Sequence, residues 1–296
     1  MAPMPERRAW DLLVDAHDMI GEGPAWDAAG SSLLWVDIAG QRIHRLHPVT
    51  GQTWTRTLGQ MVGAVLPRAS GGLALCLQDG VWLTDTDAGE PRLLAAIEAD
   101  DEVTRLNDVK TDRAGRLWGG TMAIDARPDA GAFYRIDADG SVVTVAAPTT
   151  ISNGIEWSPD GSLMYYIDTA TRRMDVFDFD PDGGTATGRR PFIQFDASLG
   201  SPDGMTIDAD GGVWVAFYDG WAIRRFKPDG ELDRTIELPA ARVTSCAFGG
   251  PDLADMFVTS AWDGLSEAQR AEQPLAGGLF IVRPGVTGLP ITPFAG

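Results

Sequence analysis

Residues 201–216 read SPDGMTIDADGGVWVA and contain the pattern that decides the fold. A polar turn, DADGG, precedes a short apolar run centred on Trp214, and a second apolar stretch, AIRRFK, follows it. Asp-Gly and Asn-Gly pairs between short apolar runs are the strongest local signal for a β-hairpin. This segment therefore predicts short antiparallel strands joined by tight turns.

The same pattern occurs six times along the chain, and the separations between its central residues are 40, 43, 47, 49 and 43. Those central residues are Trp35, Leu75, Trp118, Tyr165, Trp214 and Phe257. A period near 45 residues with about four strands per unit is typical of a β-propeller. The sequence predicts an all-β, six-bladed β-propeller spanning residues 1–296 as one domain. We expect residues before about 20 to supply a strand that closes the ring onto the last blade. The one helical candidate, LSEAQRAEQ (265–273), reads as an inserted loop.

Composition excludes several classes of protein. The 296 residues include 24 Lys and Arg against 42 Asp and Glu, a formal charge of −18, which disfavours nucleic acid and an anionic membrane as partners. No run approaches the roughly 18 apolar residues of a membrane span, and the N-terminus does not resemble a secretory signal. Cys76 and Cys246 lie in separate apolar runs, so we expect buried, reduced thiols and a cytoplasmic protein. The sequence does not reveal the oligomeric state, and a monomer is the default expectation.

Five polar residues recur at one position of the repeat. Glu22, Asn107, Asn153, Asp203 and Ser245 lie 11 to 13 residues before the central residue of their units. That position is the entrance to the first strand, which lines the central channel of a propeller. Equivalent positions around a closed ring converge, so we expect these side chains to meet at one mouth of the channel.

Two chemical interpretations of this convergence stay open from the residues alone. The carboxylates of Glu22 and Asp203 and the amide oxygen of Asn153 suit a divalent cation, and two carboxylates neutralise its charge. Without a cation the clustered carboxylates would repel each other, and the pKa of one would rise. However, Asp and Asn before Gly are also ordinary turn residues that bond their own backbone. Ser245 has no neighbouring base and is interpreted as channel lining.

At these residues the chain resembles the family of senescence marker protein (regucalcin), gluconolactonase and luciferin-regenerating enzyme. The strings that carry the resemblance are GEGPAWD (21–27), LLWVDI (33–38), RLNDVKTDRAGRLWGGTM (105–122), ISNGIEWSPDG (151–161), SPDGMTIDADGGVWVA (201–216), VTSCAFGG (243–250) and PLAGGLFIV (274–282). They keep the family's order and spacing from about residue 20 onward. The resemblance implies a six-bladed propeller that holds one divalent metal at its centre and hydrolyses sugar lactones.

Transferred position by position, the resemblance implies roles for individual residues. Glu22, Asn153 and Asp203 would be the metal ligands, and Asp203 would also be the general base. Calcium, zinc, manganese, magnesium and iron(II) all remain candidates for the metal, because oxygen ligands accept many cations.

The resemblance also implies substrate contacts. Arg105 and Asn107 would bind the substrate. Asp125, just after the Gly-Thr-Met string, would contact sugar hydroxyls, although some members carry the longer Glu there.

The expected function is metal-dependent hydrolysis of the carboxylic ester of a sugar aldonolactone, a pentono- or hexonolactone, to its aldonic acid. Asp203 would activate the attacking water. Two alternatives stay open: a metal-binding propeller without catalysis, and a promiscuous hydrolase of other lactones or of phosphotriesters. A Ser-His-Asp triad is disfavoured because the chain has no GxSxG motif.

Overall fold

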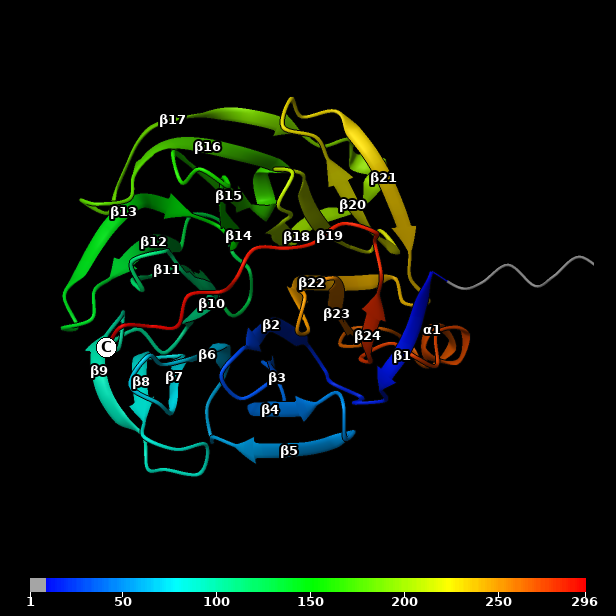
Figure 1. Cartoon of the computed structure of the whole chain (residues 1–296), viewed down its shortest axis with the longest axis horizontal. Helices are drawn as coiled ribbons and strands as arrows, with labels where there is room; N and C mark the ends of the chain where they lie inside the picture. The colour runs from blue at the N-terminus through cyan, green and yellow to red at the C-terminus, as the bar shows by residue number, and fades with distance from the viewer. Residues whose placement is uncertain (1–8) are drawn as a thin grey trace, which may run out of the picture.

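The computed structural model describes residues 9–296 as a ring of six four-stranded antiparallel sheets around a central channel (Figure 1). This confirms the predicted six-bladed β-propeller. Each sheet is given from the channel outward. The first consists of β2 (Gly21–Asp27), β3 (Ser32–Asp37), β4 (Arg42–His47) and β5 (Gln52–Thr57), and the second of β6 (Val62–Pro67), β7 (Leu73–Leu77), β8 (Gly80–Thr84) and β9 (Arg92–Ala96). The third consists of β10 (Thr104–Thr111), β11 (Leu117–Ala123), β12 (Gly131–Ile136) and β13 (Val142–Thr149). The next two are β14 (Ser152–Trp157), β15 (Leu163–Asp168), β16 (Arg173–Asp180) and β17 (Thr185–Gln194); and β18 (Ser201–Ile207), β19 (Val213–Tyr218), β20 (Ala222–Phe226) and β21 (Leu232–Glu237).

The sixth sheet joins the two ends of the chain. Its strands are β22 (Arg242–Gly249), β23 (Asp255–Ala261), β24 (Leu279–Val282) and, outermost, β1 (Trp10–Val14). Trp10 pairs with Val282, and its ring packs edge-on against Phe280 at 5.5 Å. The closing segment expected before residue 20 thus includes β1, while residues 1–8 lie outside the described part of the chain.

The central residues of the six repeats all lie on the second strand of their sheets and are buried. The three tryptophans among them also donate an indole N–H to a buried aspartate, which satisfies a polar group inside a dry core. The pairs are Trp35 with Asp18 (2.9 Å), Trp118 with Asp112 (2.9 Å) and Trp214 with Asp208 (2.8 Å). Asp112 and Asp208 follow the inner strands of their blades, so their carboxylates join the first strand of a blade to the second.

Every inner strand has a break in its pairing register near its start. The breaks fall between Glu22 and Ala25, Val62 and Ala64, Leu106 and Val109, Asn153 and Ile155, Pro202 and Met205, and Val243 and Ser245. A β-bulge bends a strand and re-aims its side chains, and bulges are common beside active sites. The bulges lie at equivalent positions, next to Glu22, Asn107, Asn153 and Asp203 on their inner strands.

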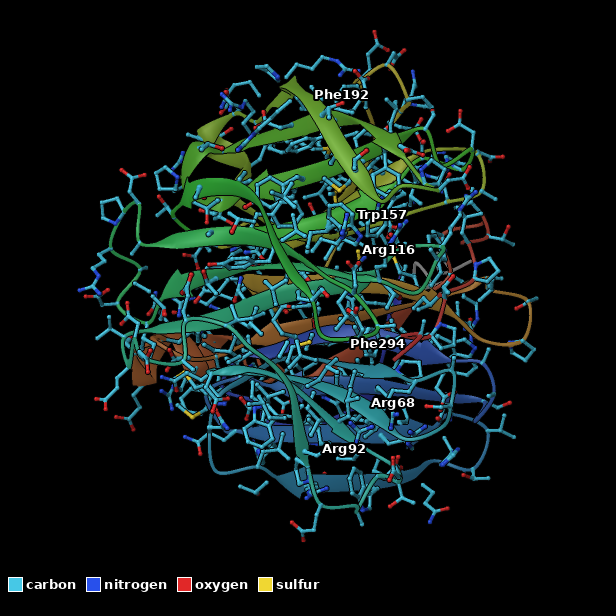
Figure 2. All side chains as sticks on the ribbon, turned by 90° about the vertical axis from the view of Figure 1, so that its left-hand side faces the viewer. Arg68, Arg92, Arg116, Trp157, Phe192 and Phe294 are labelled. Carbon is cyan, nitrogen blue, oxygen red and sulfur yellow. The ribbon has the colours of Figure 1, made fainter. Side chains whose placement is uncertain are left out.

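The C-terminal segment crosses one end of this channel (Figure 1, red). Gly288 bridges to Asp208, and Phe294 bridges to Arg68, whose guanidinium also donates to the carbonyl of Gly296. Phe294 is fully buried between the sheets, and Figure 2 places it close to Arg68. The segment therefore connects distant blades and covers this end of the channel.

Helical structure is minor in the described residues. The α-helix α1 (Glu267–Glu272) lies in the β23–β24 connection, where the sequence predicts an inserted loop, and Ser266 begins it with a capping box. Two 3₁₀ turns, η1 (Thr169–Thr171) and η2 (Ala197–Leu199), precede β16 and β18. Within residues 9–296 no helix has both the length and the apolar character needed to cross a membrane. Cys76 and Cys246 are free and buried, as expected, and burial raises the pKa of each thiol to about 12.

Candidate functional site

Five of the six expected site residues lie on the inner strands of four blades. Glu22 is on β2, Arg105 and Asn107 are on β10, Asn153 is on β14 and Asp203 is on β18. Each side chain is at most 8% exposed. The bulges therefore bring together, in a buried channel, residues that are up to 181 positions apart in the sequence.

Arg105 and Asn107 form a fixed pair. The Arg105 guanidinium donates to the Asn107 side-chain oxygen (2.7 Å) and to the Leu106 carbonyl (3.1 Å), and it contacts the Met122 sulfur at 3.3 Å. Arginine offers a rigid fork of donors, so these contacts leave other N–H groups for a ligand. Met122 belongs to the Gly-Thr-Met string that the sequence associates with substrate binding.

Hydrogen bonds connect this pair to the next two blades. The Asn107 amide nitrogen donates to the Ser152 carbonyl (2.7 Å) and to the Asn153 side-chain oxygen (3.2 Å). The Asn153 amide nitrogen donates to the Thr169 hydroxyl (3.0 Å), which donates to the Pro202 carbonyl (2.8 Å). This network fixes the Asn153 amide, which also hydrogen-bonds the Asp203 carboxylate.

Glu22 and Asp203 are two carboxylates in a poorly solvated space. Burial raises the pKa of Glu22 well above its ordinary value, and the charges of Asp203 and Asp108 raise it further. Burial also raises the pKa of Asp203, as does the charge of Asp108, while a hydrogen bond from Asn153 and the charge of Arg105 oppose the shift. The cluster thus carries more negative charge than Arg105 alone compensates.

The protein supplies one cation at this level of the channel. Burial lowers the pKa of Arg105 to about 10, although the charges of Glu22 and Asp203 favour its protonated form. The guanidinium therefore remains charged at neutral pH and faces the two carboxylates.

Asp108 is a buried channel residue that the sequence analysis missed. It is 4% exposed, and its Oδ2 atom has no hydrogen-bond partner among the described residues. Adjacent side chains of a regular strand point to opposite faces, so Asn107 alone is expected in the channel. The bulge between Leu106 and Val109 turns both Asn107 and Asp108 inward.

Asp125 lies apart from these residues, in the turn after β11. Its side chain is 67% exposed, and its carboxylate accepts the backbone N–H of Arg127 at 3.2 Å. It is three residues beyond Met122, which contacts Arg105. The structure therefore places Asp125 outside the buried cluster.

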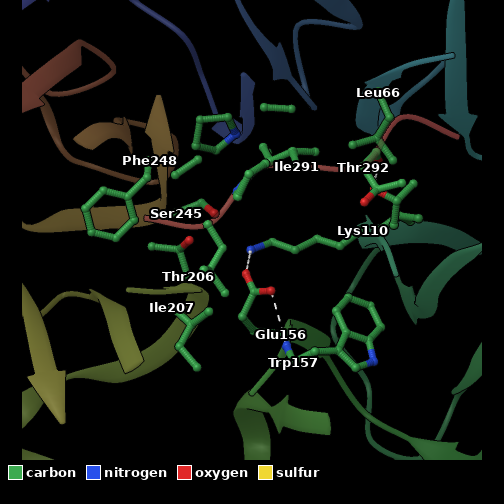
Figure 3. A pocket seen from close by; sticks show the side chains of 18 of the residues that line it. Leu66, Lys110, Glu156, Trp157, Thr206, Ile207, Ser245, Phe248, Ile291 and Thr292 are labelled. Atoms are coloured by element: carbon green, nitrogen blue, oxygen red, sulfur yellow. Dashed lines mark hydrogen bonds and ion pairs between the residues drawn. The ribbon is translucent and has the colours of Figure 1, made fainter. Parts of the chain in front are cut away.

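A cavity of about 80 Å³ lies immediately beyond the cluster, in the half of the channel that the C-terminal segment covers (Figure 3). It begins at Gly23 and Asp108, each one residue past Glu22 and Asn107, and extends to Leu289–Thr292. Lys110 and Glu156 face each other inside it, with Nζ and Oε2 3.0 Å apart. Ser245, which shares the repeat position of the cluster residues, lines the same cavity.

The donor set at the cluster fits one divalent cation. Within residues 9–296 no group of three or more His, Cys, Asp or Glu side chains is arranged to hold a metal ion. The cluster instead offers two carboxylates, Glu22 and Asp203, and the amide oxygen of Asn153. Hard cations accept such mixed oxygen ligands, and a cation would favour the charged carboxylates, whose pKa values are raised by burial and by their mutual repulsion.

Comparison with known proteins finds the same architecture. A family model described as SMP-30/gluconolactonase/LRE-like matches residues 20–262. Regucalcin of Danio rerio is 37% identical over 291 residues, covering 97% of this chain and 98% of that protein. A Bacillus subtilis protein named as a sugar lactone lactonase, YvrE, is 36% identical and covers 96% and 98%.

Solved structures give the same result. A calcium-binding regucalcin from Agrobacterium tumefaciens superposes with a TM-score of 0.94 at 31% identity, covering 97% of each chain. A luciferin-regenerating enzyme superposes with a TM-score of 0.90, also at 31% identity, covering 97% of this chain and 99% of that one. The family model matches most of the chain, and relatives more than 30% identical cover nearly all of it. This chain therefore belongs to the SMP-30/gluconolactonase/LRE-like family.

Proposed function

We propose that this protein is a metal-dependent lactonase that hydrolyses a sugar aldonolactone to its aldonic acid. The observation that carries the proposal is the convergence of Glu22, Asn153 and Asp203 beside the Arg105–Asn107 pair in one buried channel. Membership of a family that includes gluconolactonases supports hydrolysis of sugar lactones in general.

Glu22, Asn153 and Asp203 would hold the cation. When bound, a divalent metal supplies Lewis-acid polarisation of the lactone carbonyl and lowers the pKa of a coordinated water. The oxygen donors accept Ca²⁺, Mg²⁺, Mn²⁺, Zn²⁺ or Fe²⁺, so restoring single metals to the stripped protein identifies the one that supports turnover.

The other steps belong to the chain's own side chains. Asp203 accepts the proton of the attacking water at a carboxylate oxygen, a general-base contribution of about 10²–10⁴-fold. Arg105 directs its free N–H groups toward the negative charge that develops on the carbonyl oxygen. Asn107 orients a sugar hydroxyl, since its amide both donates and accepts. Asp125, at the mouth, accepts hydrogen bonds from hydroxyls of the part of the sugar that projects from the channel.

The test is proton release from a panel of aldono-1,4- and 1,5-lactones, with spontaneous hydrolysis subtracted. We expect one lactone to be hydrolysed rapidly, the activity to disappear on chelation, and single metals to restore it. Asp203→Ala should abolish turnover without unfolding the protein. Asp210→Ala, an exposed aspartate seven residues further on in the turn after β18, is the matched control and should keep full activity. A fully active, metal-replete Asp203→Ala protein contradicts the proposal.

Two other functions predict different results in the same assay. A metal-binding platform without catalysis would bind the cation but hydrolyse no lactone above background. A hydrolase of other esters would show a higher kcat/KM on a phosphotriester or non-sugar lactone than on any sugar lactone. The retained Arg105–Asn107 pair favours the sugar lactonase, because a simple metal site does not need it. We extend the proposal to a cytoplasmic monomer, which gel filtration and fractionation test.

A further inference from the structure

A buried ion pair spans the channel beneath the candidate site. Lys110 is two residues beyond Asp108 on β10, so the two side chains share a face of the strand, about 7 Å apart along it. The Lys110 ammonium lies 3.0 Å from the Glu156 carboxylate and also donates to the Met205 carbonyl. These contacts connect three blades, and Figure 3 shows the Lys110–Glu156 pair inside the cavity.

The roles proposed above do not explain this pair. Lys110 and Glu156 are 19% and 18% exposed, and both open into the cavity rather than onto the outer surface. An ion pair removed from water seldom stabilises a fold more than well-packed apolar residues would, because each charge loses its hydration. An effect of the two charges on the electrostatics of the channel would explain why the pair is present.

The charges along the inner strands have a simple balance. In the channel four carboxylates, Glu22, Asp108, Glu156 and Asp203, face two cations, Arg105 and Lys110. Arg113 also lines the cavity, but it lies in the exposed turn after β10, where solvent screens its charge. Their formal sum is −2, which one divalent cation neutralises. Without Glu156 the sum is −1, and without Lys110 it is −3.

We propose that the Lys110–Glu156 pair sets the affinity of the metal site by fixing the charge of the channel beneath it. This inference depends on the proposed function, because it assumes that Glu22, Asn153 and Asp203 hold a cation. Lys110 and Glu156 touch neither the metal nor the substrate in this proposal and act only through the field that they create.

Asp108 provides the connection between the pair and the site. Asp108 lines the same cavity as Lys110 and Glu156, and the strand period places it on the same face of β10 as Lys110. Asp108 also directly follows Asn107, whose amide donates to the Asn153 side-chain oxygen at 3.2 Å, so it connects the cavity to the proposed ligands. Charges in a buried channel are screened far less than surface charges, so a change of one unit here reaches the ligands.

The experiment is calorimetric titration of the chelator-stripped full chain with Ca²⁺ alone. Glu156→Gln keeps the shape of the side chain but leaves the Lys110 charge uncompensated, so we expect Ca²⁺ affinity to fall by about tenfold. The double variant Lys110→Met/Glu156→Gln restores the channel charge to −2. Its affinity should return to within about threefold of wild type, a recovery that mere structural damage would not show.

An exposed ion pair supplies the matched control. Glu231→Gln removes the same unit of charge from the Lys227–Glu231 pair, which is 3.2 Å long and lies on the surface. Its Ca²⁺ affinity should equal that of wild type, because surface charges are screened by salt. If Glu156→Gln fails to fold, Lys110→Met, which leaves the Glu156 carboxylate without its partner, should bind Ca²⁺ about tenfold more tightly.

The outcomes separate the two proposals. If wild type binds no Ca²⁺ and no other divalent cation, the proposed function fails and this inference fails with it. If wild type binds and Asp203→Ala does not, but Glu156→Gln matches wild type, only this inference is overturned. A double variant as weak as Glu156→Gln alone also overturns it.

Discussion

Replacing Gly63 with alanine should damage the site from a blade that contributes no ligand to it. Gly63 occupies the bulge of β6, the repeat position that holds Glu22 on β2 and Asn107 on β10. A Cβ atom added there would lie 2.2 Å from the Asn107 carbonyl oxygen, 2.6 Å from the Leu106 oxygen and 2.9 Å from the Leu106 carbonyl carbon. All three are backbone atoms, so no side-chain rotation can relieve the contact.

The magnitude follows from that geometry. Ordinary Cβ contacts begin near 3.4 Å, so β10 must recede by about 1 Å, and overpacking of this kind costs about 1–3 kcal/mol. For a chain of this size the Tm should fall by roughly 2–5 °C. Because Asn107 moves with its backbone, kcat/KM on the preferred lactone should fall by about 100-fold, the usual effect of a 1 Å misplacement.

A second glycine variant separates strain from displacement. Gly51 has φ of +70° and open space around its Cβ position, so Gly51→Ala costs about 1 kcal/mol through backbone strain alone. We expect its kcat/KM to match wild type. The two variants are compared by thermal unfolding and by lactone hydrolysis with saturating metal. If Gly63→Ala retains wild-type kcat/KM, or loses no more activity than Gly51→Ala, the reasoning is refuted.

Three further predictions concern stability and the buried thiols. Asp208→Ala leaves the Arg225 guanidinium without its buried partner at 2.7 Å and should destabilise the fold by about 3 kcal/mol in urea titrations, whereas exposed Asp229→Ala should not. Burial alone would raise the pKa of Asp208, but hydrogen bonds, above all the one from Arg225, outweigh burial and lower this pKa. The stabilisation that the Asp208 carboxylate gives to wild type should therefore be lost as pH falls below about 4, and the stability of Asp208→Asn should lack this dependence on acid. Phe294→Ala should cost about 3–5 kcal/mol, because this fully buried ring holds the C-terminal segment, and a Tm equal to wild type would contradict that role. Cys76 and Cys246, whose pKa values burial raises to about 12, should not react with Ellman's reagent at pH 8 until guanidinium unfolds the chain; rapid reaction of the native protein would show that they are accessible.

The sequence predicted most of the fold because the deciding signals are local and repeated. Each Asp-Gly turn specifies its own hairpin, and a central residue such as Trp214 marks the second strand of a blade. Closure of the ring brings equivalent positions together, so spacing alone predicted that Glu22, Asn153 and Asp203 converge. The identity of the bound group and of the substrate came from family resemblance, since oxygen ligands and turn residues look alike in a single sequence.

The features that escaped prediction depend on contacts between blades or on departures from strand periodicity. Asp108 was missed because a regular strand would turn it away from Asn107, and a bulge has no clear local sequence signature. The Lys110–Glu156 pair joins residues 46 positions apart on different blades. The C-terminal segment carries no repeat signal, so its course across the channel became visible only in the structure.

The ring of bulges also explains why only some blades supply oxygen donors to the site. Blades 1, 4 and 5 present the oxygen donors Glu22, Asn153 and Asp203, while blade 2 presents Gly63. An acidic side chain at Gly63 would collide with the β10 backbone, so this position cannot supply a third carboxylate without moving Asn107. The absence of a side chain instead lets the backbone of β10, which carries Arg105 and Asn107, approach β6 closely. The propeller can therefore separate ligand-bearing blades from a substrate-binding blade through the residue type at one repeated position.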